Sequence, residues 1–439
     1  MKKNWLYIVF LALFLGICLI FPVGTWLSGP SEAGANEVLS QPPKWEDKEG
    51  NWNDACLQDA AAWYNDHFYL RQELVSTQRL LTGKIFGTSG EDSVILGKDG
   101  WLFYGSTLED FTGTTGLTQR DIYAMARNLY LMSQEKPLIF LVAPNKNSLY
   151  PQYMPDYGVQ AEMTAGELLQ EQLRQLGVNF VDIYAAFQKE PVLYYATDSH
   201  WNQKGAALAA DLINQAAGKT TDYYAGPFAP GEPYTGDLYE MLYPAFSGTE
   251  TDWVYGGQLD FSYVGNAQRP DSITLQTQSD ETGSLLVYRD SFGNLLYPYL
   301  ADSFGSVRFS RSTTYDLTGE EEVVVLELVE RNLSYLMEKA PVCHNPTVEI
   351  TLPEPAGTAL LEKDTKANAP EGYVLWQGTL DSTPDVQSSV YVSAGGEVYE
   401  AFLLKENGVA LYLPEGVQPD TLAWETGGVL ESKTISEKG

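Results

Sequence analysis

Hydrophobic and polar residues follow a regular order over the middle of the chain. Short apolar runs there predict buried strands at 137–142, 179–183, 285–288, 307–309 and 323–328. Amphipathic segments predict helices at 118–134, 163–176, 203–215, 294–300 and 330–339. Strands that alternate with helices favour a mainly parallel sheet with helices on both faces, so the fold class is α/β.

Other patterns flank this region. Residues 55–81 have helical periodicity, and His67 within it is expected to be a structural hydrogen-bonding group. Residues 94–104 predict a hairpin, because two apolar runs surround a Lys-Asp-Gly turn. From 348 onward short alternating runs predict a small all-β module of sandwich type. That module could bind carbohydrate or act as a spacer; its aromatic candidates are Trp376, Tyr391 and Tyr399.

The N-terminus carries the longest apolar run. Lys2 and Lys3 precede an uncharged stretch, 5–27, that is long enough to cross a hydrocarbon core. By the positive-inside rule, the residues after about Ser28 lie outside the cell, which predicts a single-pass anchor in the cell membrane. A cleaved signal peptide is the alternative, with 33–35 (Ala-Gly-Ala) as its cleavage sequence. In either case the folded part is exported.

Composition narrows the function. The 439 residues include 58 Asp and Glu against 27 Lys and Arg, a formal net charge of −31, which argues against nucleic-acid binding. Cys56 and Cys343, the two cysteines beyond the apolar run, either form one disulfide or are buried thiols. No metal-ligand spacing or phosphate-binding loop is evident, so neither a metal nor a cofactor is expected.

Two short strings suggest serine-nucleophile chemistry. A serine hydroxyl needs an imidazole to accept its proton and a carboxylate to orient that imidazole. His200 is the one histidine of three with a carboxylate two residues before it, and in an extended segment Asp198 would project from the same face. Ser291 lies between a predicted strand and a predicted helix, where free backbone N–H groups can stabilise an oxyanion. Asn202 is a suitable N-cap for the helix after the histidine.

These strings are similar to those of a known family. Segments 198–201 and 288–293, together with 97–103 and 143–146, resemble the SGNH-hydrolase-like proteins of the AlgJ/AlgX alginate O-acetyltransferase type, particularly the DHHW branch. The resemblance covers about residues 55–339. It implies a flavodoxin-like SGNH-hydrolase-type fold in a circularly permuted motif order, in which the serine string comes last.

The resemblance also implies residue roles. Ser291 would be the nucleophile, His200 the general base and then acid, and Asp198 its orienter. Arg289 stands where the wider superfamily has the glycine of its Gly-Asp-Ser string, which leaves the shape of the oxyanion hole open. Its expected donors are the Ser291 N–H and Asn294, with Arg289 as a further oxyanion or substrate residue.

A triad of this kind performs acyl transfer through an acyl-serine. Outside the cell an acetyltransferase must receive acetyl groups from a membrane partner, and the relatives work beside a membrane-bound O-acyltransferase. We therefore expect O-acetylation of a cell-surface polysaccharide through an acetyl-serine. Two alternatives are an exported carbohydrate acetylesterase and a catalytically silent glycan-binding or assembly scaffold.

The predicted organisation has four parts. They are a membrane anchor at 1–28, a linker at 29–54, a catalytic domain at 55–340 and a β module at 341–439.

Overall fold

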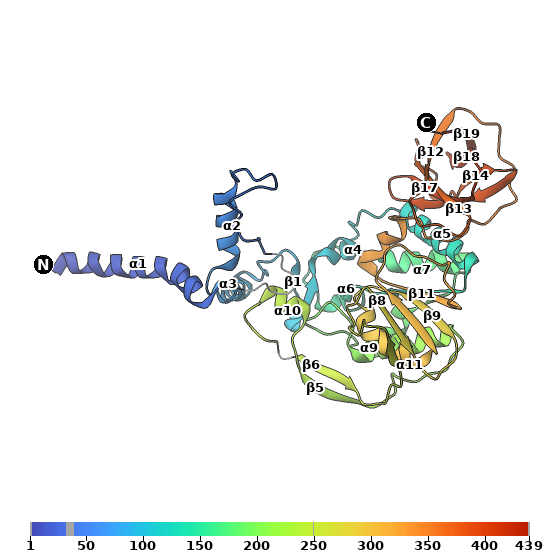
Figure 1. Ribbon diagram of the computed structural model, residues 1–439. Helices are drawn as coiled ribbons and strands as arrows, with labels where there is room; N and C mark the ends of the chain where they lie inside the picture. The colour runs from blue at the N-terminus through green and yellow to red at the C-terminus, as the bar shows by residue number, and fades with distance from the viewer. Residues whose placement is uncertain (1, 32–38, 249, 438–439) are drawn as a thin grey trace.

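The computed structural model of the chain describes residues 2–31, 39–248 and 250–437. The possible cleavage sequence at 33–35 lies outside these residues. Figure 1 shows an N-terminal helix that extends away from a central α/β body, with a β module at the opposite end of that body.

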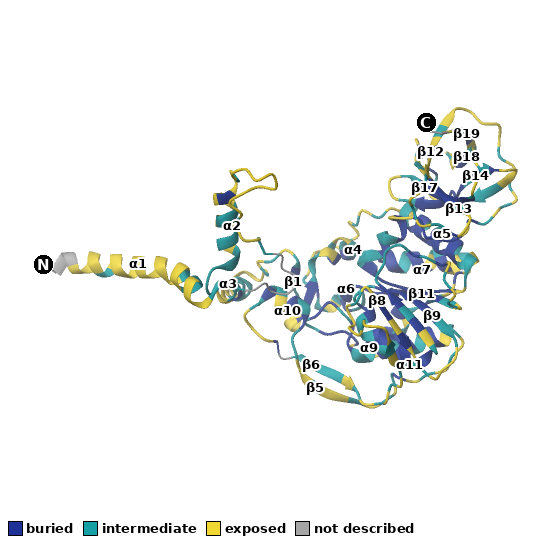
Figure 2. Ribbon diagram, viewed as in Figure 1, coloured by how far each residue is buried: buried dark blue, intermediate teal, exposed yellow. Residues whose placement is uncertain are grey.

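The N-terminal segment consists of three helices, α1 (Lys2–Ser28), α2 (Cys56–His67) and α3 (Arg71–Phe86). Within the described residues, one helix is long and apolar enough to cross a membrane, Trp5–Ser28 of α1, and its side chains are almost all exposed (Figure 2). The single helix predicted at 55–81 is interrupted, because Leu70 adopts a left-handed conformation with φ 63°. His67 has the expected structural role: its Nδ1 bonds the carbonyl of Trp63 at 2.7 Å.

A seven-stranded sheet forms the centre of the body, in the order β4-β3-β11-β9-β10-β8-β7. The first five of these strands pair in parallel, whereas β8 and β7 add antiparallel pairs at one edge. The strands are β3 (Leu138–Ala143), β4 (Phe180–Val181), β7 (Ser262–Val264), β8 (Thr274–Gln278), β9 (Ser284–Tyr288), β10 (Ser306–Ser310) and β11 (Val323–Val329).

Helices cover both faces of this sheet. Alternate residues of β3 enter different cores: Phe140 packs with α5 and α7 on one face, and Leu141 packs with α9 and α11 on the other. These helices are α5 (Gln119–Glu135), α7 (Ala165–Leu176), α9 (Gln203–Ala216) and α11 (Gly293–Ser303). Thr118 and Thr164 begin α5 and α7 with capping boxes. The helix predicted at 330–339 is a 3₁₀ helix, η4 (Glu330–Met337).

Short elements connect these layers. The predicted hairpin is present as β1 (Val94–Leu96) and β2 (Leu102–Tyr104), paired antiparallel. A second hairpin, β5 (Phe228–Tyr234) with β6 (Glu250–Tyr255), is inserted after α9. The remaining short helices are η1 (Lys98–Gly100), η2 (Gly105–Thr107), α4 (Leu108–Thr112), α6 (Lys146–Leu149), η3 (Pro151–Tyr153), α8 (Ile183–Phe187) and α10 (Asp237–Leu242).

The C-terminal module is a single eight-stranded sheet, where the sequence pattern suggested a two-sheet sandwich. Trp376 was expected among its exposed aromatics, but only 1% of it is exposed and it packs in the module's core. Tyr391 and Tyr399 are half-buried. The strands are β12 (Thr358–Asp364), β13 (Tyr373–Thr379), β14 (Val390–Ala394), β15 (Glu397–Glu400), β16 (Phe402–Leu404), β17 (Gly408–Pro414), β18 (Pro419–Thr426) and β19 (Val429–Glu437).

Helix α5 joins the module to the body. Arg127 of α5 forms a two-pronged ion pair with the buried Glu400, and the Asn128 amide bonds both backbone groups of Leu403. These contacts are buried, which favours one fixed arrangement of the two parts. Cys56 and Cys343 are both buried and free, as in the thiol alternative.

Candidate active site

Ser291 lies in the turn between the end of β9 and the start of α11. Asp290 shapes this turn: its carboxylate accepts from the N–H of Phe292 at 3.0 Å, from that of Val329 at 2.8 Å and from Asn332. The N–H of Asp290 in turn donates to the fully buried Glu327 at 3.2 Å. Burial raises the pKa of Glu327 well above its usual value, with the charge of Asp290 adding to the effect. A buried carboxyl group with a raised pKa thus bonds the backbone of the serine turn.

His200 is held between two buried segments. The segment 196–200 is a series of bends, not the extended strand predicted from the spacing. Asn202 caps α9 as predicted, because its side-chain oxygen accepts from the N–H groups of Lys204 and Gly205. Trp201 is fully buried and donates from its indole to the carbonyl of Phe292 at 3.1 Å. The neighbours of the histidine and of the serine are thus bonded to each other.

The three predicted triad residues lie in one hydrogen-bonded chain. His200 Nδ1 is 2.7 Å from Asp198 Oδ1, and His200 Nε2 is 2.8 Å from Ser291 Oγ. With Nδ1–H donated to the carboxylate, Nε2 is the acceptor for the serine hydroxyl. Asp198 Oδ1 also accepts from the N–H of His200 at 2.9 Å, so a local turn brings the carboxylate to the ring.

The carboxylate of Asp198 is almost completely buried and fully bonded. Its Oδ2 accepts from the Tyr234 hydroxyl at 2.7 Å and from the Asp237 N–H at 2.8 Å. Burial alone would raise the pKa of Asp198, but the bonds and charge of His200 and these two donors lower it below its usual range. Asp198 is therefore ionised and can stabilise an imidazolium.

Asp237 is a second carboxylate at the histidine, and the sequence patterns did not indicate it. Its Oδ2 lies 3.6 Å from His200 Nδ1 and accepts from the Ser199 hydroxyl at 2.6 Å. Burial and the charge of Asp198 raise the pKa of Asp237. Asp198, His200 and Asp237 could together supply three metal-ligand atoms, but hydrogen bonds within the site already engage these atoms.

These charges predict the pH dependence of the site. Burial works to lower the pKa of His200, but Asp198 and then Asp237 outweigh it, so the pKa lies above the ordinary 6.5. Since a general base must be neutral, kcat/KM should rise with pH through a midpoint above 6.5. In Asp237→Asn that midpoint should move to lower pH. A pH profile of kcat/KM measures both, and an unmoved or higher midpoint in the variant would contradict the assignment.

A buried lysine fixes the segment that carries Asp198. Lys146 is 4% exposed and lies over the rings of Trp101 and Phe103. Its ammonium group donates to three backbone carbonyls, those of Tyr195 at 3.1 Å, Ala196 at 2.9 Å and Asp198 at 2.6 Å. Burial lowers the pKa of Lys146 to about 7, while the charges of Asp198, Asp237 and Glu250 act in the opposite direction.

Glu250 holds the same segment through its N–H groups. Its carboxylate accepts from the backbone of Ala196 and Thr197 and from the Thr197 hydroxyl. Lys146 thus bonds the backbone carbonyls of the segment, and Glu250 bonds its backbone N–H groups. We call Lys146 and Glu250 the loop clamp.

Replacing Lys146 with Met should disrupt this clamp. Three carbonyls would lose their donor in a buried place, which should lower the free energy of unfolding by about 3 kcal/mol. Displacement of Asp198 should also reduce kcat by about 100-fold. Chemical denaturation and kinetics measure the two effects, and Lys98→Met, which changes an exposed lysine, is the control. Full kcat in Lys146→Met would contradict the positioning role.

The two predicted oxyanion residues contact each other. Arg289 is buried, and its Nη1 donates to Asn294 Oδ1 at 2.6 Å while its Nη2 bonds the carbonyl of Pro270. A side chain at Gly293 would lie 2.4 Å from the Arg289 Cδ, so the arginine requires a glycine there. In the described chain, no hydrogen-bond acceptor is found for the Ser291 N–H, which leaves this donor available.

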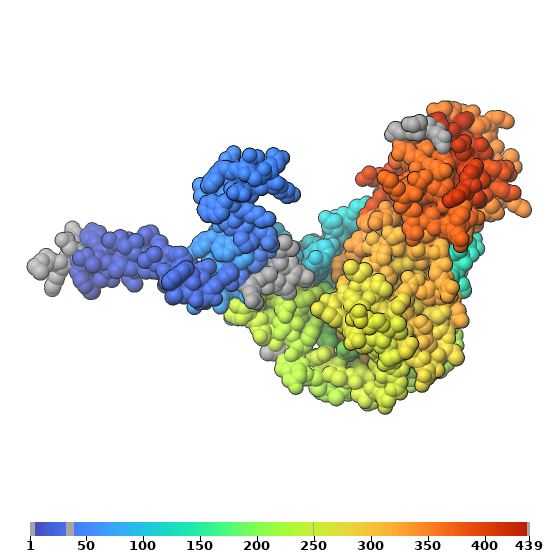
Figure 3. Space-filling view, in the orientation of Figure 1, coloured from blue at the N-terminus to red at the C-terminus, as the bar shows by residue number. Residues whose placement is uncertain are grey.

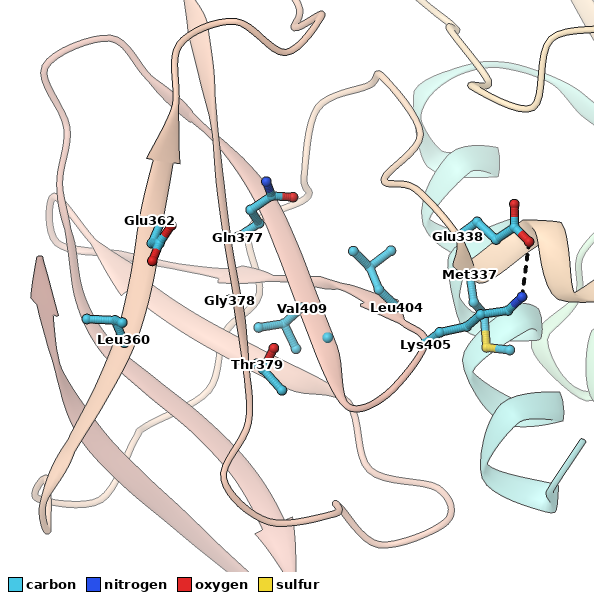
Figure 4. Close-up of a pocket in the computed structure, with 11 residues that line it drawn as sticks. Met337, Glu338, Leu360, Glu362, Gln377, Gly378, Thr379, Leu404, Lys405 and Val409 are labelled. Atoms are coloured by element: carbon cyan, nitrogen blue, oxygen red, sulfur yellow. Dashed lines mark hydrogen bonds and ion pairs between the residues drawn. The ribbon is translucent and has the colours of Figure 1, made fainter. Parts of the chain in front are cut away.

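Arg331 is a further residue beside the triad that the sequence patterns did not indicate. Its guanidinium lies 5.6 Å from the ring of Phe292 and 5.2 Å from that of Tyr104. It also lines a cavity of about 300 Å³ that extends to Lys405 of the β module. Lys405 in turn lines a cavity of about 640 Å³ against the module, where Figure 4 shows its ion pair with Glu338. Neither cavity is lined by a triad residue.

Comparison with known proteins agrees with the motifs. Residues 94–253 match the family described as the SGNH hydrolase-like domain of acetyltransferase AlgX. This part of the chain is thus similar to an AlgX-type SGNH hydrolase-like domain. The match includes Asp198 and His200 and ends before Ser291. It confirms the family resemblance predicted from the sequence strings.

The relatives are acetyl-transferring proteins by name. "Probable alginate O-acetylase AlgJ" of Pseudomonas syringae pv. tomato is 29% identical over 261 residues, which cover 54% of this chain and 60% of that protein. The protein of the same name from Pseudomonas putida is 24% identical over 205 residues, or 43% and 52% of the two chains. The matched part is thus less than two thirds of these relatives.

Three solved structures are similar at lower identity. A DHHW family protein from Eubacterium siraeum has 17% identity and a TM-score of 0.40, covering 54% of this chain and 89% of that one. The O-acetyltransferase domain of Pseudomonas putida AlgJ has 20% identity and a TM-score of 0.38, covering 55% and 92%. Bacillus cereus PatB1 with a sulfonyl adduct has 16% identity and a TM-score of 0.43, covering 55% and 95%.

Proposed function

We propose that the chain is an exported, membrane-anchored O-acetyltransferase that modifies a cell-surface polysaccharide. The observation that carries the proposal is the hydrogen-bonded chain from Asp198 through His200 to Ser291, with one free backbone N–H at the serine. The AlgJ names of the curated relatives support acetyl transfer to a glycan. The flavodoxin-like fold, the permuted order and the four domain boundaries given above are parts of this proposal.

The reaction follows from the triad in two half-reactions. In the first, Ser291 Oγ attacks the acetyl carbonyl of the donor as its proton passes to His200 Nε2. The tetrahedral oxyanion accepts from the Ser291 N–H and collapses, and His200 returns the proton to the leaving group. In the second, a glycan hydroxyl gives its proton to His200 and attacks the acetyl-serine. A new ester forms, and the proton returns to Ser291 Oγ.

The donor and the acceptor approach from different parts of the molecule in this proposal. Helix α1, as a single-pass anchor, keeps the extracellular body beside a membrane-bound O-acyltransferase that supplies acetyl groups. Two cavities share Lys405 as a lining residue, one beside Arg331 and one against the β module, and an acceptor glycan would extend along them. The module would then bind the acceptor chain.

Arg331 should contribute to acceptor binding. In Arg331→Ala we expect KM for the glycan to rise about tenfold, with kcat little changed. This is the effect of losing an interaction that stabilises the bound glycan equally in the ground state and in the transition state. Initial rates against acceptor concentration measure this. A lower kcat at unchanged KM would place the arginine in the chemical step.

The function is tested by the acetyl content of the envelope glycan. A strain that produces the Ser291→Ala variant should lose glycan acetylation. Reintroducing the wild-type chain into that strain should restore it. Unchanged acetylation would contradict the proposal. Rapid hydrolysis of acetylated sugars by the purified protein, without transfer to an added glycan, would instead identify an esterase.

A further inference from the structure

The end of the apolar helix α1 is fixed to the segment between α2 and α3. The rings of Phe21 and Phe68 meet edge to face at 5.5 Å, and the N–H of Tyr69 donates to the Thr25 hydroxyl at 2.8 Å. The apolar span of 24 residues is roughly 36 Å long, somewhat more than the hydrocarbon core. If α1 crosses the membrane, these contacts lie at its outer surface.

Helix α3 has one face against the body. Ser76 is buried and accepts from the N–H of Ala245 at 3.0 Å. Arg79 donates to the carbonyl of Met241 at 2.7 Å, and a Cβ at Gly83 would lie 3.1 Å from Leu96. At 100° per residue, these three positions of α3 share one side of the helix.

The opposite side of α3 carries an exposed stripe of three apolar residues that is interrupted by Gln78. Leu74, Leu81 and Ile85 are 44%, 52% and 67% exposed and follow one another at helical spacing. The elements that hold the inner face, α10 and β1, lie on the side of α3 away from α1 (Figure 1). The stripe therefore faces the side from which α1 arrives.

A tryptophan pair lies at the far end of α2. Trp45 and Trp52 are each 65% exposed, with ring centroids 6.0 Å apart, and Leu57 nearby is 80% exposed. Helix α2 runs across the direction of α1 (Figure 1), and the loop 44–53 projects with it from the body (Figure 3). Tryptophan is enriched at membrane–water interfaces, where one end of the ring is apolar and the other is hydrated.

We propose that α2, α3 and the loop 44–53 form an interfacial foot that lies on the phospholipid bilayer crossed by α1. The proposal rests on the proposed membrane anchoring. Its apolar side chains enter the boundary between headgroups and acyl chains, as those of in-plane amphipathic helices do. Continuity with α1 selects lipid as the occupant of the stripe. The foot holds the catalytic body at a fixed height above the bilayer. The sequence composition had instead predicted a flexible linker between the anchor and the body.

Site-specific photo-crosslinking in the full chain tests this proposal. A benzoylphenylalanine replaces Leu81 or Ile85 in protein reconstituted into vesicles of phosphatidylethanolamine and phosphatidylglycerol, and lipid adducts are identified by mass. Trp26 of α1, 82% exposed, is the positive control position. Ile273, 75% exposed on the α/β body, is the matched negative control.

We expect lipid adducts at positions 26, 81 and 85 and none at 273. Adducts at 26 without adducts at 81 and 85, or equal amounts at 81, 85 and 273, would overturn the foot and leave the anchor standing. Protein-only adducts at 81 and 85 would assign the stripe to a protein partner and also overturn it. Absence of adducts at all positions would overturn the anchor and the foot together.

Discussion

Ser291→Ala should reduce kcat for acetyl transfer by about 10⁶-fold, the effect of removing the nucleophile from a complete triad. The variant should fold normally, because the Oγ contacts His200 and no buried group depends on it. Purified wild-type and variant protein are compared with an activated acetyl ester as donor and an oligosaccharide as acceptor, together with thermal unfolding.

Ser199→Ala is the matched control for this prediction. Its hydroxyl lies 3.2 Å from His200 Nδ1, on the opposite side of the ring from the nucleophile, and donates to Asp237. We expect this variant to retain most of its activity. A loss as large as that of Ser291→Ala, or an active Ser291→Ala protein, would show that the nucleophile is misassigned.

Asp198→Asn should reduce kcat by about 10⁴-fold, because the amide cannot orient the imidazole correctly. If its NH₂ faces His200, the ring is forced into the tautomer that cannot accept the serine proton. If its NH₂ faces the other way, it meets two donors, the Tyr234 hydroxyl and the Asp237 N–H. Either orientation leaves a buried donor unpaired, which should cost about 1–3 kcal/mol of unfolding free energy.

Kinetics and denaturation of Asp198→Asn and Asp237→Asn separate the two carboxylates. Of the two carboxylates, Asp198 alone lies within hydrogen-bond distance of Nδ1, so the second variant should keep most of its kcat and change mainly the pH midpoint. Equal losses in both variants would mean that the carboxylates act as a pair and that the single-orienter assignment is wrong.

Sequence patterns predicted those parts of the site that depend on contacts between residues close together in the chain. The strand-to-helix turn at Ser291 and the Asn202 cap of α9 both depend on residues within a few positions of each other. The Asp198–His200 contact was predicted for a partly wrong reason, since a turn and not an extended segment brings the two side chains together.

Long-range contacts were beyond these patterns. Lys146 reaches carbonyls about 50 residues away, Asp237 comes from a helix after an inserted hairpin strand, and Glu250 begins the partner strand of that hairpin. No spacing rule connects such positions. Lys146 belongs to segment 143–146, which contributed to the family resemblance. A lysine at this position does not by itself predict that its side chain bonds three backbone carbonyls.

Burial also escaped prediction where only tertiary packing decides it. Trp376 was expected on the surface of the β module and lies in its core, because it packs with buried residues of the neighbouring strands. The burial of Arg289 and its bond to Asn294 were not predicted either, and its role as an oxyanion or substrate residue stays a prediction. Leu70 interrupts the helix predicted at 55–81 with a backbone conformation that its side chain does not favour.

The central claim is that Ser291 is an activated nucleophile, and labelling with a serine-reactive sulfonyl fluoride tests it most directly. Intact-mass and peptide mass spectrometry of the full chain should find one adduct, on Ser291. His200→Ala should abolish it, because the hydroxyl then has no base. An unlabelled wild-type protein that still binds glycan, or a label on another residue, would contradict the account.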